Sequence, residues 1–285
     1  MKVSLVVITY NWPQALLRVL ESIAAQSRLP DEVIVTDDGS AAPTRLLIEQ
    51  AAAQFPCRIA HVWQDDLGFR AARARNRGIA ASRGAYVILL DGDMLLHRHF
   101  VADHVELARA GTFLQGGRLR AKELETTRLL VGGTPRFDWR LDGEFGARRE
   151  FQRRHALHAR WLARIAGRRR GNVMSCNMSF WRTDLDRVNG FDERMEGYGS
   201  EDLELAARLR NAGVRQRQLK FAGLAIHLHH TTRAPVDPDD LSMPNNRLLQ
   251  ETRKQLLLRC EHGLDQYRDE FALPPPDLRR QPKLD

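Results

Sequence analysis

The sequence has few cysteines and no long hydrophobic run. Its 285 residues include three cysteines (Cys57, Cys176 and Cys260), an odd number that is widely scattered along the chain. This pattern excludes a disulfide-stapled secreted domain and favours a reducing compartment such as the cytoplasm. The longest apolar runs, Leu5–Ile8 and Tyr86–Leu90, have the length of strands and are far too short to span a membrane.

Other absences narrow the class further. The N-terminus lacks the pattern of a signal peptide, and the chain has no low-complexity tract and no obvious internal repeat. At 43% hydrophobic and 28% charged residues, the composition is that of a soluble globular protein. The length fits one large α/β domain or two closely packed halves.

Arginine is abundant and unevenly distributed. The chain carries a formal net charge of +8, and Arg148–Arg170 alone contains nine arginines with aromatic and aliphatic residues between them. Such a segment suits an anionic membrane surface, a phosphate-bearing ligand or nucleic acid. A solvated helical face would give a similar composition, so both interpretations stay open.

The first hundred residues alternate between strand-like and helix-like patterns. The apolar, β-branched runs predict strands at 3–9, 32–36, 58–63 and 85–90, and the periodicity predicts helices from 13, at 43–54 and at 70–82. This alternation is typical of a parallel sheet, which binds ligands at the carboxyl ends of its strands. Polar clusters occur at three of those ends: Thr9–Asn11, Asp37–Ser40 and Asp91–Asp93.

The pattern after residue 97 is less regular. Residues 98–131 mix helix with at least one strand, and 132–170 is irregular and then basic. A second organised block follows, with a strand at 176–181, a loop at 197–200, a helix at 201–211 and a strand and turn at 220–230. We further expect a helix at 248–260 and a loose, Pro- and Arg-rich tail.

Several of these segments contain residues that could bind a metal ion, contact a nucleotide or remove a proton. Asp91 and Asp93 can share a divalent cation with phosphate oxygens, although an acidic turn would look the same. Asp38 follows a strand and can accept a hydrogen bond from a nucleotide, although a capped turn also fits. The acidic pair Glu201–Asp202 begins a helix that Ser200 could cap, and a carboxylate there could remove a proton from a hydroxyl.

Histidines close the second block. His227 and His230 lie three residues apart, and neutral imidazole is a common metal ligand. Regular strand alternation would instead place His227 beside His229 and point His230 to the opposite face.

Five ordered motifs carry a resemblance to known enzymes. The segments VVITYNWPQAL, EVIVTDDGS, GFRAARARNRGIA and YVILLDGD resemble the inverting glycosyltransferases of family 2. The later segment VMSCNMSFWRTDLDRVNGFDERMEGYGSEDLELAARLRNAG is similar to the second half of β-1,4-galactosyltransferases and chondroitin-type polymerases. The resemblance covers about residues 3–232. It implies an α/β GT-A fold, which is a Rossmann-like, mostly parallel sheet with helices on both faces and an added acceptor-binding half.

The resemblance also implies that different parts of the chain bind the nucleotide-sugar and the acceptor. Residues 1–97 would form the nucleotide-sugar-binding half, 98–232 the acceptor-binding and catalytic half, and 233–285 a helical extension with a loose tail. Thr9 and Tyr10 would line the nucleotide pocket, and Asp38 and Arg70 would contact the base, normally uracil. Asp91 would lie against ribose or diphosphate.

The remaining roles concern the metal and the acceptor. The resemblance implies Mn²⁺ or Mg²⁺ bound by Asp93 and by a late histidine, which is best matched by His230 and next by His227. Asp202 would be the catalytic base, with Glu201 beside it holding acceptor hydroxyls. Two further positions depart from the family: Tyr198 stands where the relatives have Trp, and Leu203 where animal galactosyltransferases have a third acid.

The expected activity is inverting transfer of a hexose or N-acetylhexosamine from a UDP-sugar to a hydroxyl of a glycan or lipid-linked glycan. We expect a role in bacterial cell-surface polysaccharide or lipopolysaccharide synthesis, in the cytoplasm, with Arg148–Arg170 in peripheral contact with the inner membrane. No nucleic acid partner is expected. One alternative is a sugar nucleotidyltransferase, which would need a Gly-rich basic loop where this chain has Thr9–Trp12. The other is a non-catalytic protein that binds nucleic acid or anionic glycan through the arginine-rich segment.

Overall fold

The apolar runs of the first ninety residues form four parallel strands of one sheet. The computed structural model describes residues 1–137, 173–231 and 237–272, so the segment 148–170 and the tail from 273 lie outside the described residues. The four strands lie in the spatial order β3-β2-β1-β4, with β1 hydrogen-bonded to both β2 and β4. They are β1 (Val3–Thr9), β2 (Glu32–Asp37), β3 (Arg58–Trp63) and β4 (Tyr86–Asp91).

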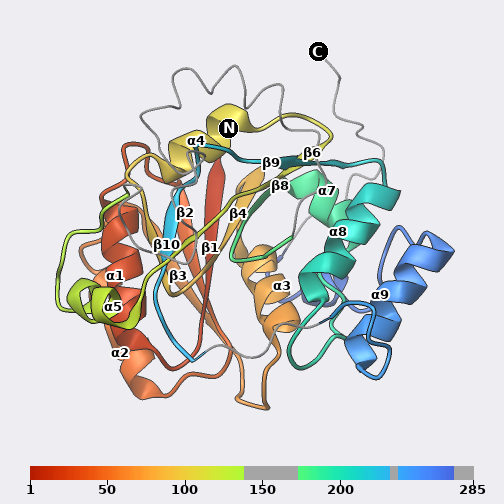
Figure 1. The fold of residues 1–285 in the computed structure, drawn as a ribbon, viewed down its shortest axis with the longest axis horizontal. Helices are drawn as coiled ribbons and strands as arrows, with labels where there is room; N and C mark the ends of the chain where they lie inside the picture. Colours follow the sequence, from red (N-terminus) through yellow and green to blue (C-terminus); the bar gives the residue numbers. More distant parts are fainter. Residues whose placement is uncertain (138–172, 232–236, 273–285) are drawn as a thin grey trace.

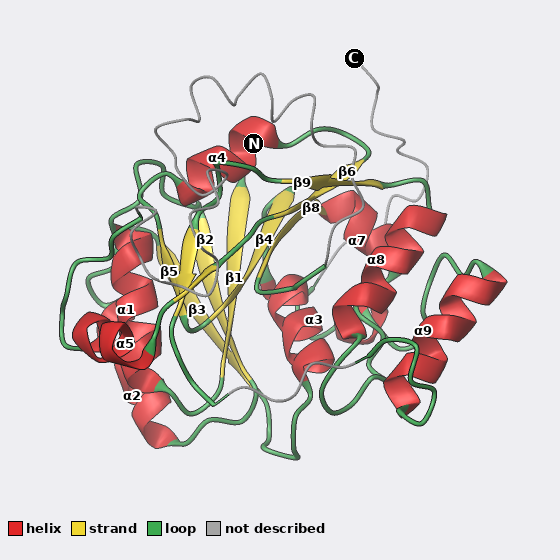
Figure 2. Ribbon diagram, viewed as in Figure 1, coloured by secondary structure: helices red, strands yellow, loops and turns green. Residues whose placement is uncertain are grey.

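Helices cover both faces of this sheet because successive strand residues point to opposite sides. Leu5 and Val7 pack in one buried cluster with α1 (Pro13–Ala24) and α2 (Ala42–Ala52), whereas Val6 packs on the other side with α3 (Ala71–Ala81). Figure 2 shows the sheet between these helices. The expected Rossmann-like arrangement is confirmed.

The second half of the chain extends the same sheet. β8 (Asn177–Trp181) pairs antiparallel with β4 and with β6 (Thr112–Gln115), and β9 (Arg215–Gln218) lies parallel to β6 at the edge. The order of the seven strands is therefore β3-β2-β1-β4-β8-β6-β9. The flanking helices of this half are α4 (Phe100–Leu107), α7 (Arg182–Val188) and α8 (Glu201–Asn211).

A small second sheet brings distant segments together. It consists of β5 (Met94–Leu96), β10 (Ala225–His227) and β7 (Leu119–Arg120), and α5 (Glu123–Leu130) follows β7. β10 runs antiparallel to β5, and His227 pairs with Met94. The sheet therefore places His227 directly beside the residues that follow Asp93.

The C-terminal part of the described chain packs on the side of α8. α9 (Pro244–Gln255) lies beside α8 in Figure 1, and a 3-10 helix follows at Leu264–Tyr267. The helix expected at 248–260 thus begins and ends earlier. It begins at Pro244 because the fixed φ of proline suits the first turn of a helix, and it ends where Leu256 adopts a left-handed conformation with φ 53°. Within the described ranges, no helix is both long and apolar enough to cross a bilayer.

Candidate active site

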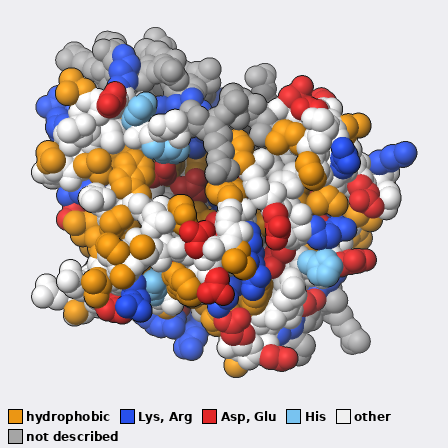
Figure 3. Space-filling view, turned by 90° about the horizontal axis from the view of Figure 1, so that it is seen from below, with side chains coloured by type: hydrophobic (Ala, Val, Ile, Leu, Met, Phe, Trp, Pro, Cys, Tyr) orange, Lys and Arg blue, Asp and Glu red, His pale blue; other side chains and the backbone are white. Residues whose placement is uncertain are grey.

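The carboxyl ends of β1, β2 and β4 meet at one edge of the sheet. The Gly92 amide donates to the carbonyl of Ile8 (2.7 Å) and the Asp38 amide to that of Thr9 (3.0 Å). A Cβ at Gly92 would lie 2.8 Å from the Ile8 oxygen, so this close approach requires glycine. Figure 3 looks at the molecule from this side and shows acidic side chains within a hollow near histidines. The three predicted polar clusters therefore share one site.

Asp93 lies close to two histidines. Its Oδ2 is 3.2 Å from His230 Nε2 and 3.4 Å from His227 Nε2. One ligand atom from each of these residues lies within 4.8 Å of the others. In the described part of the chain, the buried Asp93 Oδ1 has no hydrogen-bond partner. One carboxylate and two imidazoles, with an orphaned oxygen, fit a divalent metal ion, and the nitrogen ligands suit Mn²⁺ better than the oxygen-preferring Mg²⁺.

The protonation state of His227 is compatible with this interpretation. Burial lowers the pKa of His227 to about 4, so its imidazole is neutral at pH 7 and offers a lone pair. The Asp93 carboxylate raises the pKa of His230 through a hydrogen bond. Strand alternation does not describe this segment, because β10 ends at His227 and the chain turns. His230 therefore returns toward Asp93, and the amide of His229 donates to Thr126 Oγ1 (2.7 Å).

Arg75 connects the two halves of the site. This buried residue of α3 donates to Asp91 Oδ1 (3.3 Å) and to Glu201 Oε1 (3.1 Å). Burial raises the pKa of Asp91, and the Arg75 charge opposes that effect. The sequence reasoning missed Arg75. It lies in the GFRAARARNRGIA motif, but nothing in an alanine- and arginine-rich helix indicates which arginine is buried.

Asp202 lies in the first turn of α8, partly buried. Its Oδ2 accepts from the Ser175 amide (3.2 Å) and its Oδ1 from the Leu203 amide (2.7 Å). Burial, together with the neighbouring Glu201 carboxylate, raises the pKa of Asp202 to about 7, although Arg75 opposes the shift. A carboxylate with a pKa near neutrality is well matched to general-base catalysis.

The loop before α8 contacts the loop after β3. Gly197 and Gly199 have positive φ values of 75° and 109°, and the Gly197 amide donates to the Phe69 carbonyl (2.9 Å). The rings of Phe69 and Tyr198 lie edge to face with centroids 6.2 Å apart. The predicted Ser200 cap is wrong: Ser200 has φ 69°, and its hydroxyl donates to Asn246 Oδ1 (2.6 Å).

The residues assigned to the nucleotide lie around the ends of β1 and β2. Asp38 is buried and accepts from Gln64 Nε2 (2.6 Å) and from the Arg70 amide (2.9 Å). The Arg70 guanidinium donates to the carbonyl of Asp65. These contacts bring Asp38 and Arg70 together, and their contact with a base stays a prediction.

The other two nucleotide residues follow β1. Thr9 is buried at the end of the strand, and Tyr10 is 52% exposed with its hydroxyl on Asp66 Oδ2 (2.9 Å). The turn after β2 is capped, because Asp37 Oδ1 accepts from the Ser40 amide (2.8 Å). The side chain of Asp38, by contrast, contacts residues of the loop after β3.

A second missed cation is Arg118, in the loop between β6 and β7. It is half-buried and donates to Cys176 Sγ (3.5 Å). Burial lowers the pKa of Arg118. Cys176 and the carboxylates of Asp91 and Asp93 together raise it by more, so the net shift is upward. Arg118 therefore adds a second positive charge, besides Arg75, that acts on Asp91.

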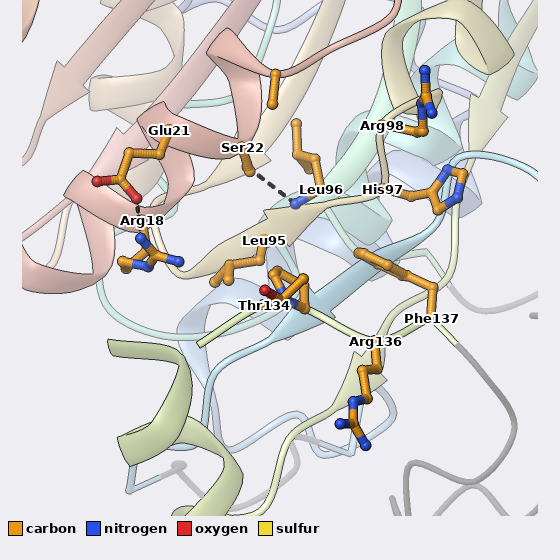
Figure 4. Close-up of a pocket in the computed structure, with 12 residues that line it drawn as sticks. Arg18, Glu21, Ser22, Leu95, Leu96, His97, Arg98, Thr134, Arg136 and Phe137 are labelled. Carbon is orange, nitrogen blue, oxygen red and sulfur yellow. Dashed lines mark hydrogen bonds and ion pairs between the residues drawn. The ribbon is translucent and has the colours of Figure 1, made fainter. Parts of the chain in front are cut away.

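A separate cavity lies beside α1 and β5. Its volume is about 690 Å³, and Figure 4 shows Leu95, Leu96 and Phe137 together with the arginines Arg18 and Arg136. None of the residues predicted for the active site lines it.

Comparison with known proteins agrees with this geometry. Residues 4–169, more than half of the chain, match the profile described as "Glycosyl transferase family 2". The chain belongs to glycosyl transferase family 2. Residues 167–231 match a second profile, "N-terminal domain of galactosyltransferase". The two profiles together cover the segments that carry the resemblance.

Curated relatives are longer than this chain. It is 32% identical to a validoxylamine A glucosyltransferase from Streptomyces hygroscopicus subsp. limoneus over an alignment of 232 residues. This alignment covers 74% of the chain and 48% of the relative. Identity to the hyaluronan synthase of Pasteurella multocida is 29% over 236 residues (74% of the chain, 23% of the relative). Identity to an Escherichia coli chondroitin synthase is 27% over 252 residues (79% and 34%). The chain thus spans about half or less of the length of these relatives.

Solved structures share the fold. S. aureus TarS 1–349, in complex with UDP-GlcNAc, superposes with a TM-score of 0.61 at 16% identity, covering 95% of this chain and 71% of that one. A mannosyltransferase from Pyrobaculum calidifontis, in complex with GDP-Man and Mn²⁺, gives a TM-score of 0.53 at 19% identity, covering 79% and 56%. The architecture is that of the GT-A fold.

Proposed function

We propose that this glycosyltransferase moves a hexose or N-acetylhexosamine from a UDP-sugar to a hydroxyl of a glycan acceptor, with inversion at the anomeric carbon. The observation that carries the proposal is the arrangement of the Asp93–His227–His230 cluster and Asp202 around one edge of the sheet, connected through Asp91, Arg75 and Glu201. A cation site for a diphosphate and a carboxylate suited to deprotonation are the two parts that such a reaction requires.

The donor half of the site binds the nucleotide, which is the leaving group of the reaction. Thr9, Tyr10, Asp38 and Arg70 surround the position proposed for the nucleoside. Asp93, His227 and His230 would hold Mn²⁺ or Mg²⁺, which, when bound, supplies positive charge to the diphosphate as it departs. The nitrogen ligands favour Mn²⁺.

The acceptor half supplies the base. Asp202 removes the proton from an acceptor hydroxyl while that oxygen attacks the anomeric carbon from the face opposite UDP. The bond to the UDP oxygen breaks as the new glycosidic bond forms, so the configuration inverts. Glu201 accepts hydrogen bonds from acceptor hydroxyls, and Arg75 keeps its carboxylate in place.

The comparisons support the donor and acceptor classes. The matched relatives include a glucosyltransferase and synthases of hyaluronan and chondroitin, and TarS was crystallised with UDP-GlcNAc. We therefore place the reaction in bacterial surface-glycan or lipopolysaccharide synthesis. A peripheral contact of residues 148–170 with the inner membrane belongs to the same proposal. Membership of family 2 argues against the nucleotidyltransferase and the non-catalytic alternatives.

The test is transfer from a panel of UDP-sugars to glycan acceptors by wild type and Asp202→Asn. Loss of the base lowers turnover by roughly 10²–10⁴-fold, while UDP binding stays within about twofold. Asp184→Asn is the matched control, because burial also raises the pKa of Asp184, to about 6, near the opposite end of β4. Near wild-type turnover in Asp202→Asn would refute the base assignment.

A further inference from the structure

We propose that Asn246, in the first turn of α9, is a positioning residue for the catalytic loop: it fixes Ser200 and thereby the place of Asp202. This inference rests on the proposed function. It makes the C-terminal helix part of the catalytic apparatus, whereas the family motifs end before that helix.

Asn246 connects three separate backbone segments inside the protein. Its side chain is fully buried, and its Oδ1 accepts from the Ser200 hydroxyl (2.6 Å). Its Nδ2 donates to the carbonyls of Asp237 (2.7 Å) and Asp240 (2.8 Å). The acceptor and both N–H donors of the amide are thus engaged. A buried polar group that loses its partner is costly because water cannot replace the lost hydrogen bond, so this geometry is strongly preferred.

Ser200 occupies a conformation that needs such support. Its φ of 69° is left-handed, a conformation that is unfavourable for a residue with a Cβ. Its carbonyl accepts from the Glu204 amide (2.9 Å) and so begins α8. Because Asp202 lies two residues further on, a change at Ser200 reorients the first turn of α8 and the proposed base with it.

The neighbouring asparagine reinforces the same contact. Asn245 Nδ2 donates to the Gly199 carbonyl (2.9 Å). Two consecutive residues of α9 therefore hold two consecutive residues of the loop, between Gly197 and the acidic pair. Without these contacts, a loop with glycines at 197 and 199 would have wide conformational freedom.

The far end of α9 makes a different kind of contact, which offers a control. Thr252 Oγ1 donates to Glu204 Oε1 (2.8 Å), within the buried ion pair of Glu204 and Arg208 (2.6 Å). This contact stabilises the body of α8 and does not involve the loop. Thr252→Val should therefore lower stability without changing the position of Asp202.

The experiment compares steady-state kinetics and urea unfolding of Asn246→Asp, Ser200→Ala and Thr252→Val. Asn246→Asp keeps the shape but cannot donate to both carbonyls; Ser200→Ala removes only the hydroxyl and covers the case in which the buried carboxylate prevents folding. We expect kcat to fall about 10–100-fold in the first two, because small misplacements of a catalytic group are costly. KM for the donor stays within about twofold, and Thr252→Val keeps wild-type kcat.

The double variant Ser200→Ala/Asn246→Asp should lose no more activity than Ser200→Ala alone, since Asn246 acts on the loop through the Ser200 hydroxyl, which that change already removes. Unchanged kcat in folded Ser200→Ala, or an equal kcat loss in Thr252→Val, would overturn the inference. Asp202→Asn, measured in parallel, separates the two proposals. If it retains turnover, the proposed base is wrong; if it loses turnover while Ser200→Ala does not, only the role of Asn246 is wrong.

Discussion

Replacement of Arg75 by methionine should strongly lower the free energy of unfolding. The size of the loss should depend on whether the carboxylates paired with Arg75 remain charged. Arg75 is buried, and its guanidinium nitrogens lie 3.3 Å from Asp91 and 3.1 Å from Glu201. At these distances each pair contributes about 5 kcal/mol at an effective dielectric constant of about 20, from which the desolvation cost of the arginine must be subtracted. Breaking a buried pair typically costs about 3–5 kcal/mol, because the remaining charge is left buried.

Partial exposure of the partners reduces this figure. The side chains of Asp91 and Glu201 are 28% and 12% exposed, so water screens them in part. We therefore expect Arg75→Met to lower the free energy of unfolding by about 2–4 kcal/mol, as measured by urea denaturation at pH 8. Adding Glu201→Gln should recover part of that loss, on the order of 1 kcal/mol, because it removes one unpaired charge.

Arg77→Met is the matched control on the same helix. Arg77 pairs with Glu270, whose side chain is 45% exposed, so its loss should cost no more than about 1 kcal/mol. If Arg75→Met costs as little as Arg77→Met, or if Glu201→Gln adds to the loss instead of relieving it, Arg75 does not stabilise these two partly buried carboxylates as described.

Two further predictions follow from the same site. Because the pKa of Asp202 in the free protein is about 7 and the base must be ionised, kcat/KM should rise with pH through a midpoint near 7 and level off above it; a profile flat from about pH 5.5 to about 8.5 would contradict the assignment. Gly39→Ala should cost about 1–3 kcal/mol in urea unfolding, because φ is 98° and the added Cβ would lie 2.5 Å from Asp66 Cα. A neutral effect of Gly39→Ala would show that the loops after β2 and β3 separate easily.

The parallel part of the fold could be predicted from local patterns. Continuous apolar runs such as Val3–Thr9 are buried on both faces, and the alternation with helices leaves few possible topologies. The acidic clusters could be placed for the same reason, because they follow strands whose carboxyl ends meet at one edge. The family motifs then added roles to individual residues.

The remaining features depend on tertiary contacts that a sequence does not display. Arg75 and Arg77 belong to the same arginine-rich helix. Arg75 forms an ion pair with Glu201 because α8 packs beside it in the folded protein. His230 reaches Asp93 because β10 ends at His227, and periodicity does not indicate where a short strand stops. Asn246 is engaged by a loop 46 residues earlier, a contact for which the sequence of α9 contains no signal.

The central claim is that Asp93 anchors a metal-dependent site for a UDP-sugar. The most direct test is calorimetric titration of the protein with UDP, with and without Mn²⁺, for wild type, Asp93→Ala and the exposed-carboxylate control Asp239→Ala. We predict UDP binding that Mn²⁺ strengthens in wild type and in Asp239→Ala, and that loses its dependence on Mn²⁺ in Asp93→Ala. Equal binding of UDP by all three proteins in the presence and absence of Mn²⁺ would contradict the claim.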